Sequence, residues 1–109
     1  MNLYKAEQFL ADAEYYYRWY LTRPTLLPDA ALDLADEFLE TVEQTLYYLI
    51  SNPLAGRPRC IRFSDLEGFR SWRVDRPFNR FAIFYRIEGD NLLAERLLEG
   101  HRLLAADRD

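Results

Sequence analysis

The spacing of apolar residues changes once along this chain, and that change limits the folds it can adopt. Residues 6–21 and 32–50 carry apolar side chains at intervals of three or four, the spacing that places them on one helix face. Residues 57–99 instead contain short segments in which apolar and polar side chains alternate, as in strands. We therefore predict an α+β fold in which the helices come first and the strands follow.

Prolines mark the limits of the two predicted helices. Pro24 and Pro28 lie between the two apolar stripes, because the residue before a proline avoids the helical conformation and proline itself suits the first helical turn. The second helix should end near Ser51, where the breaker-rich stretch "SNPLAGRP" begins. Two helices joined by a short loop form an antiparallel hairpin, here about residues 6–51, which must bury its apolar stripe against another layer.

That layer is a small, mainly antiparallel β-sheet, predicted over about residues 57–99. Its four segments are "RCIRF", "FRSWRVD", "RFAIFYRIE" and "NLLAERLLE", separated by turn signals such as "DRPFN" and "EGDN". Phe84 stands on a strand face that also carries arginines, which predicts a central strand with both faces partly covered. The opening "MNLY" is a candidate edge strand. Together the two halves predict a single domain over residues 1–109.

Charge is unevenly distributed along a chain whose formal net charge is −4. Residues 1–51 carry three basic and nine acidic residues, a balance of −6, whereas residues 57–86 carry eight arginines and three acids, a balance of +5. Proteins that bind nucleic acid by themselves usually present a basic domain, so the acidic helical half argues against independent nucleic-acid binding.

The composition also bears on location and cofactors. No apolar run approaches the roughly 20 residues of a membrane span, and the first residues lack the basic and apolar regions of a signal peptide, so we expect a cytoplasmic protein without membrane contact. One cysteine and one histidine, Cys60 and His101, are too few for a zinc site, and the four glycines form no phosphate loop. We predict no metal and no cofactor, and expect Cys60 to be inert because no histidine lies near it in sequence.

Several motifs resemble a known family when they are taken in order. They are "NPLAGRPR" after the second helix, then "GFRSWRV", "FAIFYRIEGD" and "ERLLEGHR". In this order and spacing, over roughly residues 6–104, the chain resembles the ParE branch of the RelE/ParE toxins of type II toxin–antitoxin systems. Such families often have a histidine where this chain has Glu99, so no histidine role is carried over to that position.

The resemblance implies a small toxin that a cognate antitoxin holds inactive. ParE-like members are associated with inhibition of DNA gyrase, and RelE-like members cut messenger RNA on the ribosome. Because function depends on the site and not on the scaffold, the residues must choose between these activities. We favour the gyrase inhibitor, which needs no enzyme activity, and keep as alternatives a ribosome-dependent endoribonuclease and a non-toxic member that only binds its partner.

A nuclease would need a proton-transfer group and cations around the phosphate. His101 is the candidate base or acid, and Arg102, Arg73 and Arg80 are candidates to hold the phosphate, which would make a metal-independent enzyme. Against this activity, Lys5 is the only lysine, so the lysine-rich site of the ribosome-dependent nucleases is missing.

A gyrase inhibitor needs a recognition surface, and arginines anchor such surfaces without proton transfer. The alternative is that each arginine is an ordinary solvated charge. The predicted target-binding residues are Arg62, Arg70, Arg73, Arg76, Arg80, Arg86 and Arg96.

Aromatic and apolar residues beside the helical stripes indicate where an antitoxin binds. Tyr15 and Trp19 on the first helix, and Leu34 and Tyr48 on the second, are predicted to be partly exposed and to contact an antitoxin helix or extended segment. The alternative is that they pack over the seam between helices and sheet.

Overall fold

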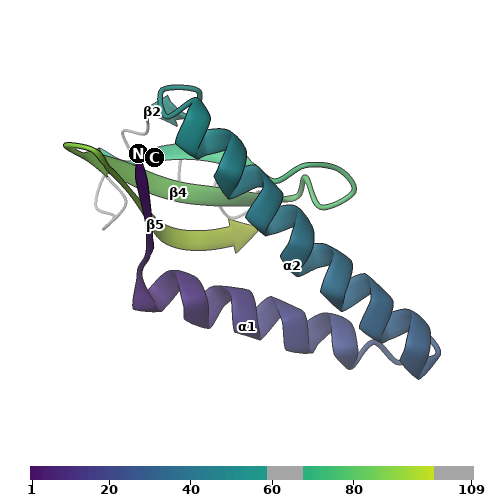
Figure 1. Cartoon of the computed structure of the whole chain (residues 1–109). Coiled ribbons are helices and arrows are strands. Elements are labelled where there is room, and N and C mark those ends of the chain that lie inside the picture. The colour runs from purple at the N-terminus through teal and green to yellow at the C-terminus, as the bar shows by residue number, and fades with distance from the viewer. Residues whose placement is uncertain (59–67, 100–109) are drawn as a thin grey trace, which may run out of the picture.

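Two helices lie on one face of a five-stranded sheet (Figure 1). A computed structural model describes residues 1–58 and 68–99. The elements are β1 (Asn2–Lys5), α1 (Glu7–Leu21), α2 (Pro28–Ser51), β2 (Arg57–Pro58), β3 (Arg70–Arg73), β4 (Phe81–Glu88) and β5 (Asn91–Glu99). The predicted α+β fold, a helical hairpin on a mainly antiparallel sheet, is confirmed. In the described residues no helix is both long and apolar enough to cross a membrane.

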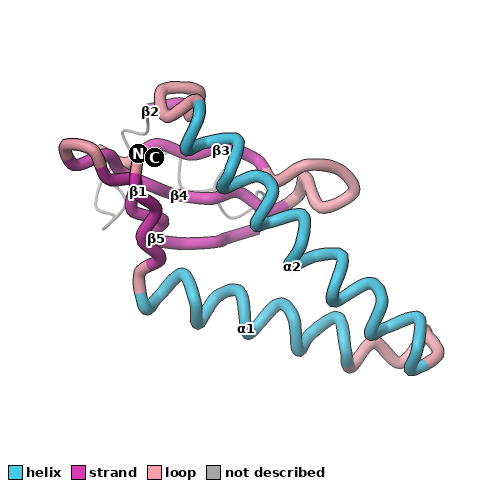
Figure 2. Tube along the Cα trace, viewed as in Figure 1, coloured by secondary structure: helices cyan, strands magenta, loops and turns pink. Residues whose placement is uncertain are grey.

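The helix boundaries agree with the prolines and the breaker-rich stretch. Pro28 occupies the first position of α2, where its fixed φ fits and its missing N–H is not needed. After Ser51 the helix closes at Asn52, whose backbone N–H donates to the carbonyls of Tyr48 and Leu49. Pro53 follows and prevents further helix. The connection of residues 22–27 then turns the chain back, so α1 and α2 converge at this end and spread apart towards the sheet (Figures 1 and 2).

The strand order is β1-β5-β4-β3-β2, which places β4 in the middle of the sheet. Every pairing is antiparallel except that of β1 with β5, which is parallel. The predicted edge strand "MNLY" is therefore present, and its backbone register runs from Asn2 opposite Asn91 to Lys5 opposite Ala94. A β-bulge between Phe84 and Tyr85 changes the register of β4 against β5.

The core lies between the helices and the near face of the sheet. Phe38 of α2 is at its centre, with its ring 5.0 Å from that of Phe81 and 5.3 Å from that of Tyr20, measured between centroids. Residues 81–85 are all buried, so β4 is covered on both faces as predicted. On the far face, Ala82 and Phe84 form a smaller cluster.

Two positions on α2 differ from the helical stripe expected from the sequence. Leu32 was expected in the core but is 44% exposed, because the neighbouring Ala31 faces inward in the same row as Ala35 and Phe38. Thr41 is a polar residue of α2 but is buried. Its hydroxyl donates to the Glu37 carbonyl at 2.8 Å, which satisfies the polar group inside the core. The predicted strand "RCIRF", residues 59–63, lies outside the described residues.

Candidate functional site

Two of the predicted target-binding arginines hold the sheet and its flanking turn together. The Arg70 guanidinium donates to the Gly56 carbonyl at 2.7 Å, across the turn that follows α2. Arg86 of β4 forms ion pairs with Glu95 at 2.9 Å and with Glu88 at 2.6 Å. Both side chains therefore stabilise the fold, in addition to the target binding that was predicted for them.

Arg96 has a comparable contact with the helical layer. Its guanidinium donates two hydrogen bonds to the Asp12 carboxylate, at 2.7 and 3.1 Å, and the same carboxylate accepts from the Leu97 backbone N–H at 3.0 Å. Asp12 belongs to α1 and Arg96 to β5, so this bidentate pair fixes the helix to its strand.

The remaining described arginines of the set gather around the β3–β4 connection. Arg73, Arg76 and Arg80 are all exposed, and the Arg73 guanidinium donates to the Asn79 carbonyl at 2.8 Å. Three other candidates, Arg62, His101 and Arg102, lie outside the described residues.

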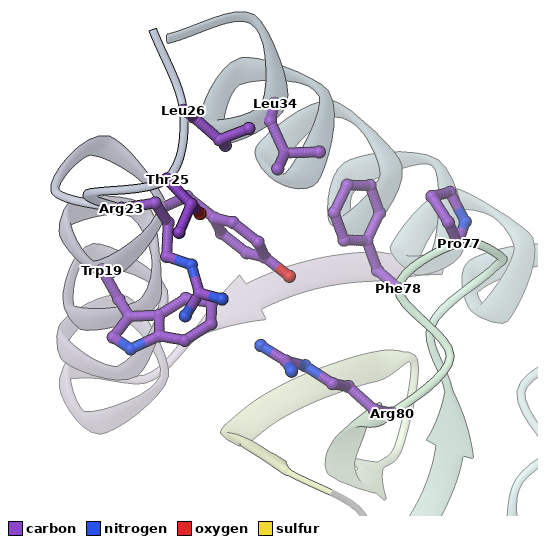
Figure 3. A pocket seen from close by; sticks show the side chains of 9 residues that line it. Trp19, Arg23, Thr25, Leu26, Leu34, Pro77, Phe78 and Arg80 are labelled. Carbon is purple, nitrogen blue, oxygen red and sulfur yellow. The ribbon is translucent and has the colours of Figure 1, made fainter. Parts of the chain in front are cut away.

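Arg80 contributes to a recess between the helical hairpin and the β3–β4 connection (Figure 3). The recess has a volume of about 340 Å³, in the lower part of the range typical of small-molecule sites. Its lining comes from the end of α1, the following connection, α2 and the turn before β4. The residues are Trp19, Tyr20, Arg23, Thr25, Leu26, Leu34, Pro77, Phe78 and Arg80.

Two cations lie against the Trp19 indole in this recess. The guanidinium carbon of Arg23 is 4.0 Å from the Trp19 ring centroid, and that of Arg80 is 4.9 Å away (Figure 3). Arg80 also lies 4.9 Å from the Phe81 ring centroid. Such cation–π contacts orient a guanidinium over the ring and leave N–H groups available at its edge.

The charges in the recess affect the pKa of the Tyr20 phenol. Burial raises its pKa above the ordinary value, while the nearby Arg80 and Arg23 guanidinium groups act in the opposite direction and Glu99 adds to the increase. The phenol is therefore protonated at neutral pH, and the field that it feels is partly set by the two arginines.

The four predicted antitoxin-binding residues are spread along the helical hairpin. Trp19 and Leu34 meet in the recess together with Arg80, which was predicted to bind the target. Tyr48 is 45% exposed and stacks on Trp72, with ring centroids 5.5 Å apart, roughly 20 Å along α2 from Leu34. Tyr15 is 64% exposed on α1.

Comparison with known proteins identifies the family. The model of the ParE toxin of the type II toxin–antitoxin system parDE matches residues 5–104. The chain belongs to this family. It is thus a ParE-type toxin of a toxin–antitoxin system, a type of system that implies an antitoxin partner.

A solved structure agrees with this ParE fold. The structure titled "Chromosomal ParDE TA system from P. aeruginosa" is 20% identical to the present chain, with a TM-score of 0.65, and the match covers 91% of this chain and 95% of that one. No curated protein compared with the chain is similar enough to count as a match.

The two motifs that carried the ParE resemblance contact each other through one side chain. The Tyr85 hydroxyl, from "IFYRIEGD", accepts from the Gly56 N–H at 2.8 Å and donates to the Pro53 carbonyl at 2.6 Å, both from "NPLAGRP". A Cβ on Gly56 would lie 2.2 Å from this hydroxyl, so only glycine fits there. The spacing between these motifs therefore reflects a tertiary contact that positions the turn after α2.

The second cation of the recess, Arg23, was not among the predicted site residues. Arg23 lies just beyond the end of α1, four positions after Trp19, which is the spacing of side chains on one helix face. That spacing was the available signal. No pattern in the sequence indicated that Arg23 and Arg80 lie against the same ring. Arg80 is distant in sequence and reaches Trp19 only because the sheet packs on the hairpin.

Proposed function

We propose that this ParE-family toxin inhibits DNA gyrase and that a cognate antitoxin neutralises it by binding the helical hairpin. The observation that carries the proposal is the family match over residues 5–104, combined with exposed arginines at one end of the sheet. Arg73, Arg76 and Arg80 are free of carboxylate partners among the described residues and can anchor a partner surface. Action on gyrase would place the protein in the cytoplasm.

The chemistry of the described residues favours binding over catalysis. The single lysine, Lys5, is paired with Glu43 at the junction of β1 and α2. Burial raises the pKa of the Tyr20 and Tyr85 phenols, which moves them further from the neutral range where a general base operates. Within residues 1–58 and 68–99 there is no histidine, so a nuclease would depend on His101.

A paired assay on one preparation tests this proposal. DNA supercoiling and cleavage are measured with purified gyrase, and cleavage of a messenger RNA is measured on programmed ribosomes. Inhibited supercoiling with trapped DNA breaks and intact RNA is the expected result. Cut RNA with normal supercoiling would reject the gyrase proposal in favour of the nuclease, and loss of that cutting in His101→Ala would assign it to the histidine. If neither reaction is affected, the chain is a binding-only member of its family.

A further inference from the structure

The recess between α1, α2 and the β3–β4 connection combines a cationic rim with an apolar lining. Its cations are Arg23 and Arg80, and both approach the same indole ring, at 4.0 and 4.9 Å from the Trp19 centroid. In Figure 3 the Arg23 guanidinium lies over Trp19, and that of Arg80 points from the opposite wall towards the centre of the recess. The two groups come from parts of the chain that only the folded state brings together.

Neither cation forms an ion pair in the described part of the chain, although the charge of Glu99 acts on the neighbouring Tyr20. The ion pairs there involve other basic groups, and neither Arg23 nor Arg80 forms one with a carboxylate. Two like charges against one ring repel each other, and an anion placed between them would remove that repulsion. The geometry thus favours a bound anion, with guanidinium edges that can bind a carboxylate through two hydrogen bonds.

The rest of the lining is suited to an apolar group. Leu26 and Leu34 line the helical side of the recess, and Phe78 lies beside Leu34 with Pro77 next to it (Figure 3). Leu26 is an exposed large apolar side chain on the connection after α1, and Phe78 is buried. A ligand with only a charged group would leave the apolar side chains of the lining in contact with water. The recess therefore fits an anion that is attached to an apolar group.

These features favour a peptide over a nucleic acid. A base would need a free aromatic face for stacking, but two guanidinium groups already lie against the Trp19 ring. The residues around the recess belong largely to the helical half, where the charge balance of residues 1–51 is −6 and repels a phosphate backbone. A single carboxylate on a peptide meets the local positive charge without placing a polyanion against that acidic half.

We propose that this recess anchors a partner segment that carries a carboxylate side chain directly beside a large apolar side chain. The carboxylate binds between Arg23 and Arg80, and the apolar side chain packs against Leu26 and Leu34. The inference rests on the proposed function, because the antitoxin is the partner that would supply the segment.

The test uses the full chain and three matched peptides, followed by NMR. The probes are acetyl-Gly-Leu-Glu-Leu-Gly-amide, the same peptide with Gln in place of Glu, and the same peptide with Ser in place of both Leu. The readout is the Trp19 indole N–H signal of the ¹⁵N-labelled protein. The second tryptophan, Trp72, stacks on Tyr48 away from the recess and serves as an internal control.

The Glu peptide should shift the Trp19 signal, leave the Trp72 signal in place and bind about tenfold more tightly than either the Gln or the Ser peptide. Arg23→Gln and Arg80→Gln should each remove most of the preference for Glu over Gln, and Arg57→Gln, an exposed arginine on β2, should retain it. Equal binding of the Glu and Gln peptides, or no shift of Trp19 with any peptide, would overturn the proposal. A single-stranded oligothymidylate that shifts Trp19 more strongly than the Glu peptide would assign the recess to nucleic acid instead.

Gyrase inhibition is read in a separate assay, so the two proposals fail separately. A Glu-selective recess in a protein that leaves gyrase active would reject the proposed target and keep the peptide site. Inhibition of gyrase by a protein that does not discriminate between the peptides would keep the target and reject the peptide site.

Discussion

At the scale of single residues, the Tyr85 hydroxyl is the most informative contact in the structure. It satisfies the Gly56 N–H and the Pro53 carbonyl inside the protein. Tyr85→Phe keeps the ring but leaves both backbone groups without their partner, and we expect a loss of about 1–3 kcal/mol in the free energy of unfolding. Urea denaturation measures the loss. Tyr47→Phe removes a hydroxyl from an exposed ring and should leave stability unchanged; similar effects of the two variants would contradict the proposed role of Tyr85.

The same phenol gives stability a dependence on alkaline pH. Burial raises the pKa of Tyr85 in the folded state above its ordinary value of 10.0, so folding favours the protonated phenol. This contribution is complete below about pH 10, the pKa in the unfolded chain, and is lost as the pH rises through the higher folded-state pKa. The free energy of unfolding should therefore fall above about pH 10, and less steeply in Tyr85→Phe. Parallel slopes for the two proteins would assign the fall to other groups, Tyr20 among them.

Residue-scale contacts were the part of the site that sequence patterns could not predict. The excess of arginines was visible in the sequence, but their partners were not, because Arg70 reaches Gly56 and Arg96 reaches Asp12 across long separations in the chain. Such contacts depend on strand register and on the docking of helices, neither of which is encoded in a local pattern. The recess was hidden for the same reason: Trp19 was predicted to be partly exposed and to contact an antitoxin, but its contact with Arg80 depends on the tertiary fold.

At the scale of elements, the docking of α1 on β5 depends on one carboxylate. Asp12 accepts two hydrogen bonds from Arg96 and one from the Leu97 backbone, and its own side chain is largely buried. Asp12→Ala leaves these donors unpaired, so we predict a loss of about 1–3 kcal/mol in the free energy of unfolding. Denaturant unfolding monitored by circular dichroism measures it.

The control for this prediction is an ion pair on the same helix. Glu14 and Arg18 are both exposed and lie four residues apart, a type of pair that contributes little. Glu14→Ala should change the unfolding midpoint very little. If Asp12→Ala is equally harmless, α1 is held on the sheet by its apolar face alone.

Element boundaries were the most predictable level of this structure. Pro28 and the "SNPLAGRP" stretch carry local steric information, and they place the ends of α2 correctly. Alternation in "RFAIFYRIE" likewise identified β4. The parallel pairing of β1 with β5 was not predictable, because a strand pattern states which face is buried but not which neighbour supplies the hydrogen bonds.

At the scale of the whole molecule, the two layers differ in charge as well as in structure. The helical half carries a strong negative balance and the arginine-rich segment a positive one, so the small net charge conceals two parts of the sequence with opposite charge. Arg86 and Arg96 form ion pairs and Arg70 donates to a backbone carbonyl, whereas Arg73, Arg76 and Arg80 lie exposed at the β3–β4 end of the described sheet. A target that carries negative charge would meet this end first.

The last prediction follows from that asymmetry and tests the proposed target surface. Arg76→Glu reverses an exposed charge on the β3–β4 connection and should weaken gyrase inhibition roughly tenfold, with a thermal midpoint close to that of the unchanged protein. Arg57→Glu makes the same charge change on the edge strand β2 and should inhibit as well as the unchanged protein. Such a result would show that the position of the charge, and not the total charge, determines inhibition. Added salt should weaken inhibition by the unchanged protein more than by Arg76→Glu, since the variant lacks one of the screened attractions. If both variants inhibit equally, the toxin meets gyrase through another face, and the arginines at the β3–β4 end serve the antitoxin alone.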